Sequence, residues 1–86
     1  MYYVYIIQSK FDKSFYIGAT NDLKRRIGEH NSGKSRFTSS KKPWSLVYLE
    51  GFVSKADALA REKKLKHHGK GLAELKKRFA RGILED

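Results

Sequence analysis

Eighty-six residues without a cysteine exclude a disulfide-stabilised fold and a thiolate metal site, and they predict one domain, residues 1–86. The hydrophobic share of 40% and the aromatic share of 13% favour a compact core over disorder. No apolar run approaches the roughly 20 residues that cross a bilayer, and no signal peptide opens the chain. We therefore expect a soluble, cytoplasmic protein with no membrane partner.

The charge is strongly positive and evenly spread. Nineteen Lys and Arg residues oppose nine Asp and Glu residues, which gives a formal net charge of +10. Residues 1–50 and 51–86 share this excess equally. A small folded domain of this charge predicts a polyanionic partner, most commonly nucleic acid. Charge for solubility, and a ribosomal or membrane-surface role, are the alternatives.

The first eighteen residues predict a β-hairpin. Two runs rich in aromatic and β-branched residues, 2–8 and 14–18, flank a polar connection. The first run is apolar on both of its faces, which is typical of a central strand. We expect the second run to end at Gly18, a residue that permits a tight backbone path or the close approach of a ligand. Four of the five tyrosines lie in this hairpin: Tyr2, Tyr3, Tyr5 and Tyr16.

A helix is predicted next, from an N-cap among residues 20–22 to about His30, followed by a polar loop over 34–43. Leu23 and Ile27 would form the buried face of this helix. The loop is expected to be either mobile or ordered by a bound polyanion. Six basic residues of the helix and loop are candidate nucleic-acid contacts: Lys24, Arg25, Lys34, Arg36, Lys41 and Lys42.

Residues 44–52 predict a third strand with Trp44 as a core anchor, and Ser54 is the expected N-cap of a helix to about Lys66. A last helix is predicted from residue 72 to about residue 81. The element order β-β-α-β-α-α indicates the α+β class, with a small, mainly antiparallel sheet flanked by helices. Three apolar residues would form the packing stripe of the last helix: Leu72, Leu75 and Phe79.

One carboxylate lies on the apolar side of its predicted helix. On a helical wheel Glu62 falls between Leu59 and Leu65, whereas Arg61 lies on the outward side. A carboxylate in an inward arc must be paired, protonated or bound to a metal. An ion pair with Arg61, Lys66 or another cation and a metal site are equally compatible with this pattern.

The tyrosines, Arg26, His30 and Glu62 are the candidates for chemistry. Each has a structural alternative: tyrosines pack in cores, Arg26 belongs to a solvated basic face, and His30 complements a helix dipole. Phosphodiester hydrolysis needs an activated water and stabilisation of charge on the phosphate. A lone carboxylate can hold one Mg²⁺ that keeps most of its waters, an arginine can clamp phosphate oxygens, and a tyrosine or histidine can relay a proton.

The arrangement of these residues closely resembles the GIY-YIG nuclease superfamily, in particular its small stand-alone members. Residues 3–5 stand at the first motif, with Tyr3 in place of glycine, and residues 16–18 match the second. The motif tyrosines, Tyr5 and Tyr16, are 11 positions apart. Three further family positions are filled at the usual spacings: Arg26, His30 and the pair Arg61-Glu62.

The resemblance implies a three-stranded antiparallel sheet flanked by helices that cuts DNA, or alternatively RNA, with one Mg²⁺ or Mn²⁺. Glu62 would ligate the metal and Arg26 would stabilise the phosphate. Tyr16 would activate or orient the water, helped by Tyr5 and His30. A catalytically weak or inactive nucleic-acid-binding module on the same fold, and a basic interaction subunit of a repair or translation assembly, remain alternatives. A protein partner is one source of specificity.

Two departures from the family pattern bear on catalysis. Many relatives carry an asparagine near the C-terminus that helps to order the site, and this chain has none after Asn31. Repair-type relatives place a lysine three positions after the second motif tyrosine, where this chain has Ala19.

Overall fold

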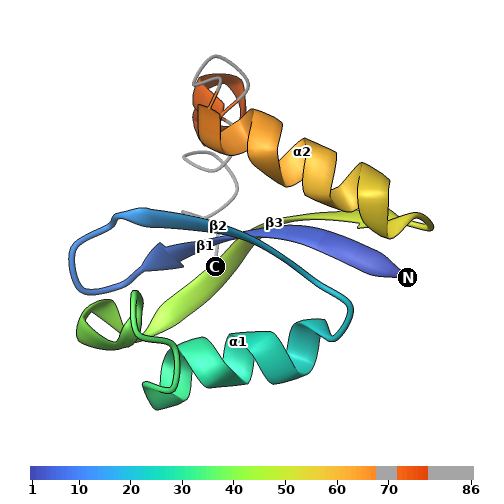
Figure 1. The fold of residues 1–86 in the computed structure, drawn as a ribbon. Coiled ribbons are helices and arrows are strands. Elements are labelled where there is room, and N and C mark those ends of the chain that lie inside the picture. The colour runs from blue at the N-terminus through green and yellow to red at the C-terminus, as the bar shows by residue number, and fades with distance from the viewer. Residues whose placement is uncertain (68–71, 78–86) are drawn as a thin grey trace.

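The computed structural model describes residues 1–67 and 72–77, which form three layers (Figure 1). An antiparallel sheet of order β2-β1-β3 is the middle layer, with α1 on one face and α2 on the other (Figure 1). The predicted α+β class and element order are confirmed. The elements are β1 (Tyr2–Ser9), β2 (Phe15–Thr20), α1 (Leu23–Ser32), a 3₁₀ turn (Ser39–Lys41), β3 (Trp44–Phe52) and α2 (Lys55–His67).

β1 is the central strand, as its two apolar faces predicted. Val4 and Ile6 are buried on the side of α2, where Ala58 and Leu65 of that helix join the same core cluster. Tyr5, which alternates with them, is buried on the opposite side in a second cluster with Ile7 and Trp44. The expected role of Trp44 as a core anchor is confirmed.

β2 continues beyond Gly18 to Thr20, so the prediction that Gly18 ends the strand was wrong. Gly18 is the cross-strand partner of Tyr5. A β-carbon at Gly18 would overlap the hydroxyl oxygen and Cζ of Tyr5. The glycine therefore admits a close approach, as expected, but the group that approaches is the ring of Tyr5 and not a ligand.

α1 begins at the predicted cap and ends two residues later than predicted. The Asp22 carboxylate accepts a hydrogen bond from the backbone N–H of Arg25 at 3.1 Å. At the other end, Gly33 adopts a left-handed conformation with φ of 85° and its N–H bonds to the Glu29 carbonyl. The helix continues until this glycine because only there does the backbone turn.

The segment 34–43 is held in place by contacts within the chain. The sequence predicted a loop that is either mobile or ordered by a bound polyanion, and these internal contacts match neither alternative. Ser35 and Thr38 are buried. The Trp44 indole N–H donates to the Thr38 carbonyl at 2.9 Å. The amide of Asn31 accepts from the Trp44 backbone N–H at 2.6 Å and donates to the Trp44 carbonyl at 3.2 Å.

α2 is capped by Ser54, whose hydroxyl accepts from the Asp57 backbone N–H at 3.3 Å. The apolar arc predicted for this helix was partly wrong, because Leu59 is 46% exposed. Arg61, expected to face outward, instead donates two hydrogen bonds to Glu50 of β3, at 2.8 and 3.1 Å. An ion pair thus joins α2 to β3, and a helical wheel alone cannot predict it.

The described part of the last helix is 72–77, in which Leu75 is buried and Leu72 is partly buried. Phe79 and the rest of that predicted helix lie outside the described residues. Across residues 1–67 and 72–77, no helix has the length and apolar character needed to cross a membrane.

Candidate active site

The two motif tyrosines lie on the same face of the sheet. The hairpin register pairs Ile7 with Tyr16, so Tyr5 stands diagonally across from Tyr16. Their ring centroids are 6.5 Å apart, and the ring of Tyr16 lies 4.9 Å from that of His30. With a spacing of 11 residues between the two tyrosines, this hairpin therefore brings both phenols close together on one face of the sheet.

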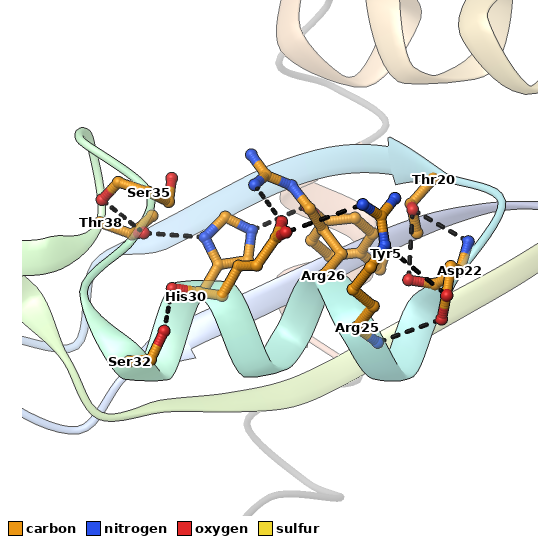
Figure 2. A network of polar contacts seen from close by, with 10 residues as sticks. Tyr5, Thr20, Asp22, Arg25, Arg26, His30, Ser32, Ser35 and Thr38 are labelled. Atoms are coloured by element: carbon orange, nitrogen blue, oxygen red, sulfur yellow. Dashed lines mark hydrogen bonds and ion pairs between the residues drawn. The ribbon is translucent and has the colours of Figure 1, made fainter.

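Tyr5 is 1% exposed, and its hydroxyl lies 2.8 Å from Nε2 of His30 (Figure 2). Burial, followed by the neighbouring Tyr16, raises the pKa of Tyr5 to about 12. The phenol therefore keeps its proton near neutral pH and acts as a hydrogen-bond donor.

His30 is fully buried and lies between Tyr5 and Thr38 (Figure 2). Its Nδ1 is 2.8 Å from the Thr38 hydroxyl, which in turn donates to the Ser35 carbonyl at 3.4 Å. Because that hydroxyl hydrogen is used, we assign the His30 proton to Nδ1, which leaves Nε2 to accept from Tyr5. Burial, with the positive charge of Arg26, lowers the pKa of His30 to about 4. His30 is thus neutral near pH 7, and both of its ring nitrogens take part in hydrogen bonds.

Arg26 is held in place by an acidic neighbour. Its Nη1 donates to the Glu29 carboxylate at 2.9 Å, and this bond contributes most to the raised pKa of Arg26. Tyr5 and Tyr16 also contribute to the raised pKa of Arg26, so the guanidinium lies close to both phenols. Sequence reasoning missed Glu29, although its position three residues after Arg26 on one helix was an available signal.

Glu62 is on the inner side of α2, with 19% of its side chain exposed and its Oε2 3.0 Å from Nζ of Lys66. Of the ion pairs that the sequence left open for Glu62, the pair with Lys66 is present and the pair with Arg61 is not. The negative charge of Glu62 makes the last and smallest of the named contributions to the raised pKa of Tyr5, so the carboxylate interacts electrostatically with that phenol.

Lys66 is a second residue that sequence reasoning did not place in the site. Its ammonium lies 5.9 Å from the centroid of the Tyr16 ring, so one cation faces both Tyr16 and Glu62. The spacing of four residues from Glu62 was the signal that could have indicated this role.

The donor set fits a single hard cation. Among the described residues, no three His, Cys, Asp or Glu side chains gather into a group that could enclose a metal. One carboxylate with open solvent beside it suits Mg²⁺, which keeps several waters and needs only one or two protein oxygens. Glu62 meets this requirement, with Lys66 as the cation that a metal would displace.

A cavity of about 410 Å³ adjoins Arg26, between the end of β2 and the first turns of α1 and α2. Arg25 and Lys55 contribute positive charge to its lining. Ala19, where repair-type relatives have a lysine, also lines this cavity. The cavity is wide enough to admit a phosphate group next to the Arg26 guanidinium.

The six predicted nucleic-acid contacts are exposed or partly exposed and come from two neighbouring segments of the chain. Arg25 is paired with Asp22 at 3.6 Å and Glu29 at 3.8 Å, and Lys41 is paired with Asp12 at 3.3 Å. Lys24 and Arg25 are on α1, whereas Lys34, Arg36, Lys41 and Lys42 belong to the segment after it.

Comparison with known proteins settles the family. The model of the GIY-YIG catalytic domain matches residues 1–79 of the chain. The chain belongs to the GIY-YIG family. The resemblance inferred from the motifs is thereby confirmed, and the three-layer architecture is a nuclease-type fold.

Several GIY-YIG relatives carry the name UPF0213. A UPF0213 protein of Streptococcus pneumoniae is 43% identical over 65 residues, which cover 74% of this chain and 65% of that protein. A second pneumococcal relative is matched over 61% of its length, so the chain spans less than two thirds of both. A Staphylococcus haemolyticus relative is 44% identical over 76% of this chain and 79% of its own.

A solved structure has the same fold. The solution NMR structure of the UPF0213 protein BH0048 from Bacillus halodurans superposes with a TM-score of 0.53 at 40% sequence identity. The superposition covers 88% of this chain and 86% of the other.

Proposed function

We propose that this chain is a divalent-metal-dependent DNA endonuclease that hydrolyses phosphodiester bonds. The observation that carries the proposal is the convergence of Tyr5, Tyr16, Arg26 and His30, from β1, β2 and α1, within electrostatic range of Glu62 on α2. Membership of a family of catalytic domains supports the same conclusion.

Glu62 would hold one Mg²⁺ or Mn²⁺ through a carboxylate oxygen, in exchange for its ion pair with Lys66. When bound, the ion supplies Lewis acidity at a phosphate oxygen and lowers the pKa of a coordinated water. After this exchange, Lys66 would keep a positive charge close to Tyr16.

Arg26 would bind the non-bridging oxygens of the phosphate. Glu29 occupies one of its N–H groups, at Nη1, and fixes the orientation of the guanidinium before substrate arrives. Other N–H groups of the guanidinium would form charge-assisted bonds to the phosphate, whose negative charge increases in the transition state.

Tyr16 is the best placed of the two phenols to orient the attacking water and, as its phenolate, to accept the proton of that water. Its ring is partly exposed, and Arg26 and Lys66 lie beside it as two positive charges that would stabilise negative charge developing on the attacking water. Tyr5 is an unsuitable base, since its pKa is about 12 and its hydroxyl already donates to His30. His30 would act as a positioning residue that fixes Tyr5.

The test is cleavage of labelled duplex, nicked, flapped and single-stranded DNA, and of RNA, with Mg²⁺ or Mn²⁺ against chelator. We expect wild-type protein and Glu74→Gln, a matched change at an exposed glutamate, to cut DNA, and Glu62→Gln to lose cutting while it still binds. Equal cleavage by Glu62→Gln and wild type would remove Glu62 from the mechanism.

A second function, nucleic-acid binding without cleavage, is supported by one contact. The ion pair between Glu62 and Lys66 at 3.0 Å satisfies the carboxylate without a metal. If Glu62 serves only in this ion pair, none of the DNA and RNA substrates is cut, but the protein still binds them. Phosphate binding would then weaken steeply with salt, through counterion release.

A further inference from the structure

Two phenylalanines project into solvent at one end of the sheet. Phe11 is 75% exposed in the turn between β1 and β2, and Phe37 is 82% exposed in the segment between α1 and β3. Neither ring takes part in the core clusters or in the candidate active site. A large exposed aromatic ring on an ordered segment is a recurrent feature of binding surfaces.

The two segments are bonded to each other. The Ser9 hydroxyl donates to the Lys41 carbonyl at 2.6 Å, and the Lys10 backbone N–H donates to the Pro43 carbonyl at 2.9 Å. The carboxylate of Asp12 pairs with the ammonium of Lys41 at 3.3 Å. These contacts hold both phenylalanines at the end of the sheet where Ser9 pairs with Trp44.

The segment that carries Phe37 is also joined to the candidate active site. Thr38, the next residue, is buried and binds Nδ1 of His30 at 2.8 Å (Figure 2). Its carbonyl accepts the indole N–H of Trp44 at 2.9 Å. Phe37 is therefore displayed from a fixed backbone, one residue away from the polar network that orients Tyr5.

Positive charge is concentrated in the two segments that carry these rings. The stretches 10–13 and 34–43 contain six basic residues and one acidic residue, Asp12, whose charge Lys41 balances. Cations that follow a phosphate backbone, together with aromatic rings on which bases stack, are how proteins bind single-stranded nucleic acid. Paired bases in a duplex hide their faces, so these rings have stacking partners only where bases are unpaired.

We propose that Phe11, Phe37 and the cations around them form a stacking surface for unpaired nucleotides, the Phe11–Phe37 surface. DNA with a single-stranded segment beside the cleaved strand is then the preferred substrate class. The preference in cleavage rests on the endonuclease function proposed above, whereas the binding surface does not depend on it.

The experiment measures binding in chelator, where no metal-dependent cleavage can occur. Fluorescence anisotropy would be recorded at fixed salt for a duplex, the same duplex with a single-stranded tail, and the single strand alone. The variants are Phe11→Ala, Phe37→Ala and both together. Val53→Ala is the control, because Val53 is 88% exposed and apolar but follows β3 at the opposite end of the sheet.

Each phenylalanine variant is expected to weaken binding of the tailed duplex and the single strand roughly tenfold, with less than about a twofold change for the plain duplex. The salt dependence should stay as in wild type, because no cation is removed. Val53→Ala should bind like wild type. Circular dichroism checks that the variants fold, which both exposed positions permit.

Two results would overturn the Phe11–Phe37 surface. Unchanged binding in the double variant would assign the rings to another partner, such as a protein, and equal weakening on all three probes would remove the preference for unpaired bases. Neither depends on Glu62. If no cleavage is found but the phenylalanine variants still weaken binding, the protein is therefore a single-strand binder. If cleavage is found but the phenylalanine variants bind like wild type, the protein is a nuclease that selects its substrate through another surface.

Discussion

The hydroxyl of Tyr5 donates to Nε2 of His30 across 2.8 Å in a region closed to solvent. This bond links the first family motif on β1 to the end of α1, and through Thr38 to the segment that precedes β3. A tyrosine whose pKa is raised and a histidine whose pKa is lowered are both neutral at pH 7, so the pair costs no buried charge.

The lowered pKa of His30 makes folding stability pH-dependent. Its folded pKa of about 4 lies below the ordinary 6.5, so the unfolded chain binds more protons between these values. The contribution is complete above pH 6.5, falls as pH drops through this window and levels off below pH 4. It amounts to about 3 kcal/mol. Urea unfolding across this range should show the slope in wild type and His67→Gln but lack it in His30→Gln.

Gly18→Ala should damage the fold and Gly28→Ala should not. A β-carbon at Gly18 would overlap the phenol of Tyr5, whereas one at Gly28 meets nothing within 4 Å. We expect Gly18→Ala to lower the free energy of unfolding by about 1–3 kcal/mol, as overpacking does. Gly28→Ala, in the middle of α1, should raise it by about 0.5–1 kcal/mol. Thermal unfolding of the two variants measures both, and equal effects would contradict the tight contact.

Arg61→Lys should uncouple α2 from β3. The guanidinium makes two hydrogen bonds to Glu50, a geometry that an ammonium cannot reproduce. We expect a loss of about 1 kcal/mol in unfolding free energy, because the pair is only partly buried. Since Glu62 is the next residue, turnover should fall more than DNA affinity.

Lys64→Arg, a change at an exposed lysine, is the matched control for Arg61→Lys. It should leave both the free energy of unfolding and the turnover unchanged. A double-mutant cycle with Glu50→Gln measures the coupling between Arg61 and Glu50. A coupling energy near zero would show that the ion pair does not position α2.

Lys66→Met should separate metal affinity from turnover. The ammonium lies 3.0 Å from Glu62, so its removal frees the carboxylate and should tighten Mn²⁺ binding several-fold. Cleavage at saturating metal should nevertheless fall, because the positive charge beside Tyr16 is lost. Isothermal titration with Mn²⁺, paired with cleavage rates, checks both. Weaker Mn²⁺ binding in the variant would contradict the competition between Lys66 and metal at Glu62.

The sequence by itself determined the element types and their order. Alternating apolar residues mark β1 as a central strand, and local caps such as Asp22 and Ser54 start the helices through bonds to residues three positions away. Motif spacings alone also placed Tyr5, Tyr16, Arg26, His30 and Glu62 in one family pattern. Such signals are readable because they depend on residues close together along the chain.

Only the tertiary structure decided how those residues are used. The exposure of Leu59, the ion pair of Arg61 with Glu50 and the extension of β2 past Gly18 all depend on contacts between elements far apart in sequence. The neutral state of His30 has the same origin, because Tyr5 and Thr38 reach it from other elements and exclude water. A helical wheel or a motif spacing contains no information about which distant side chain lies opposite, and burial, hydrogen bonding and pKa follow from that neighbour.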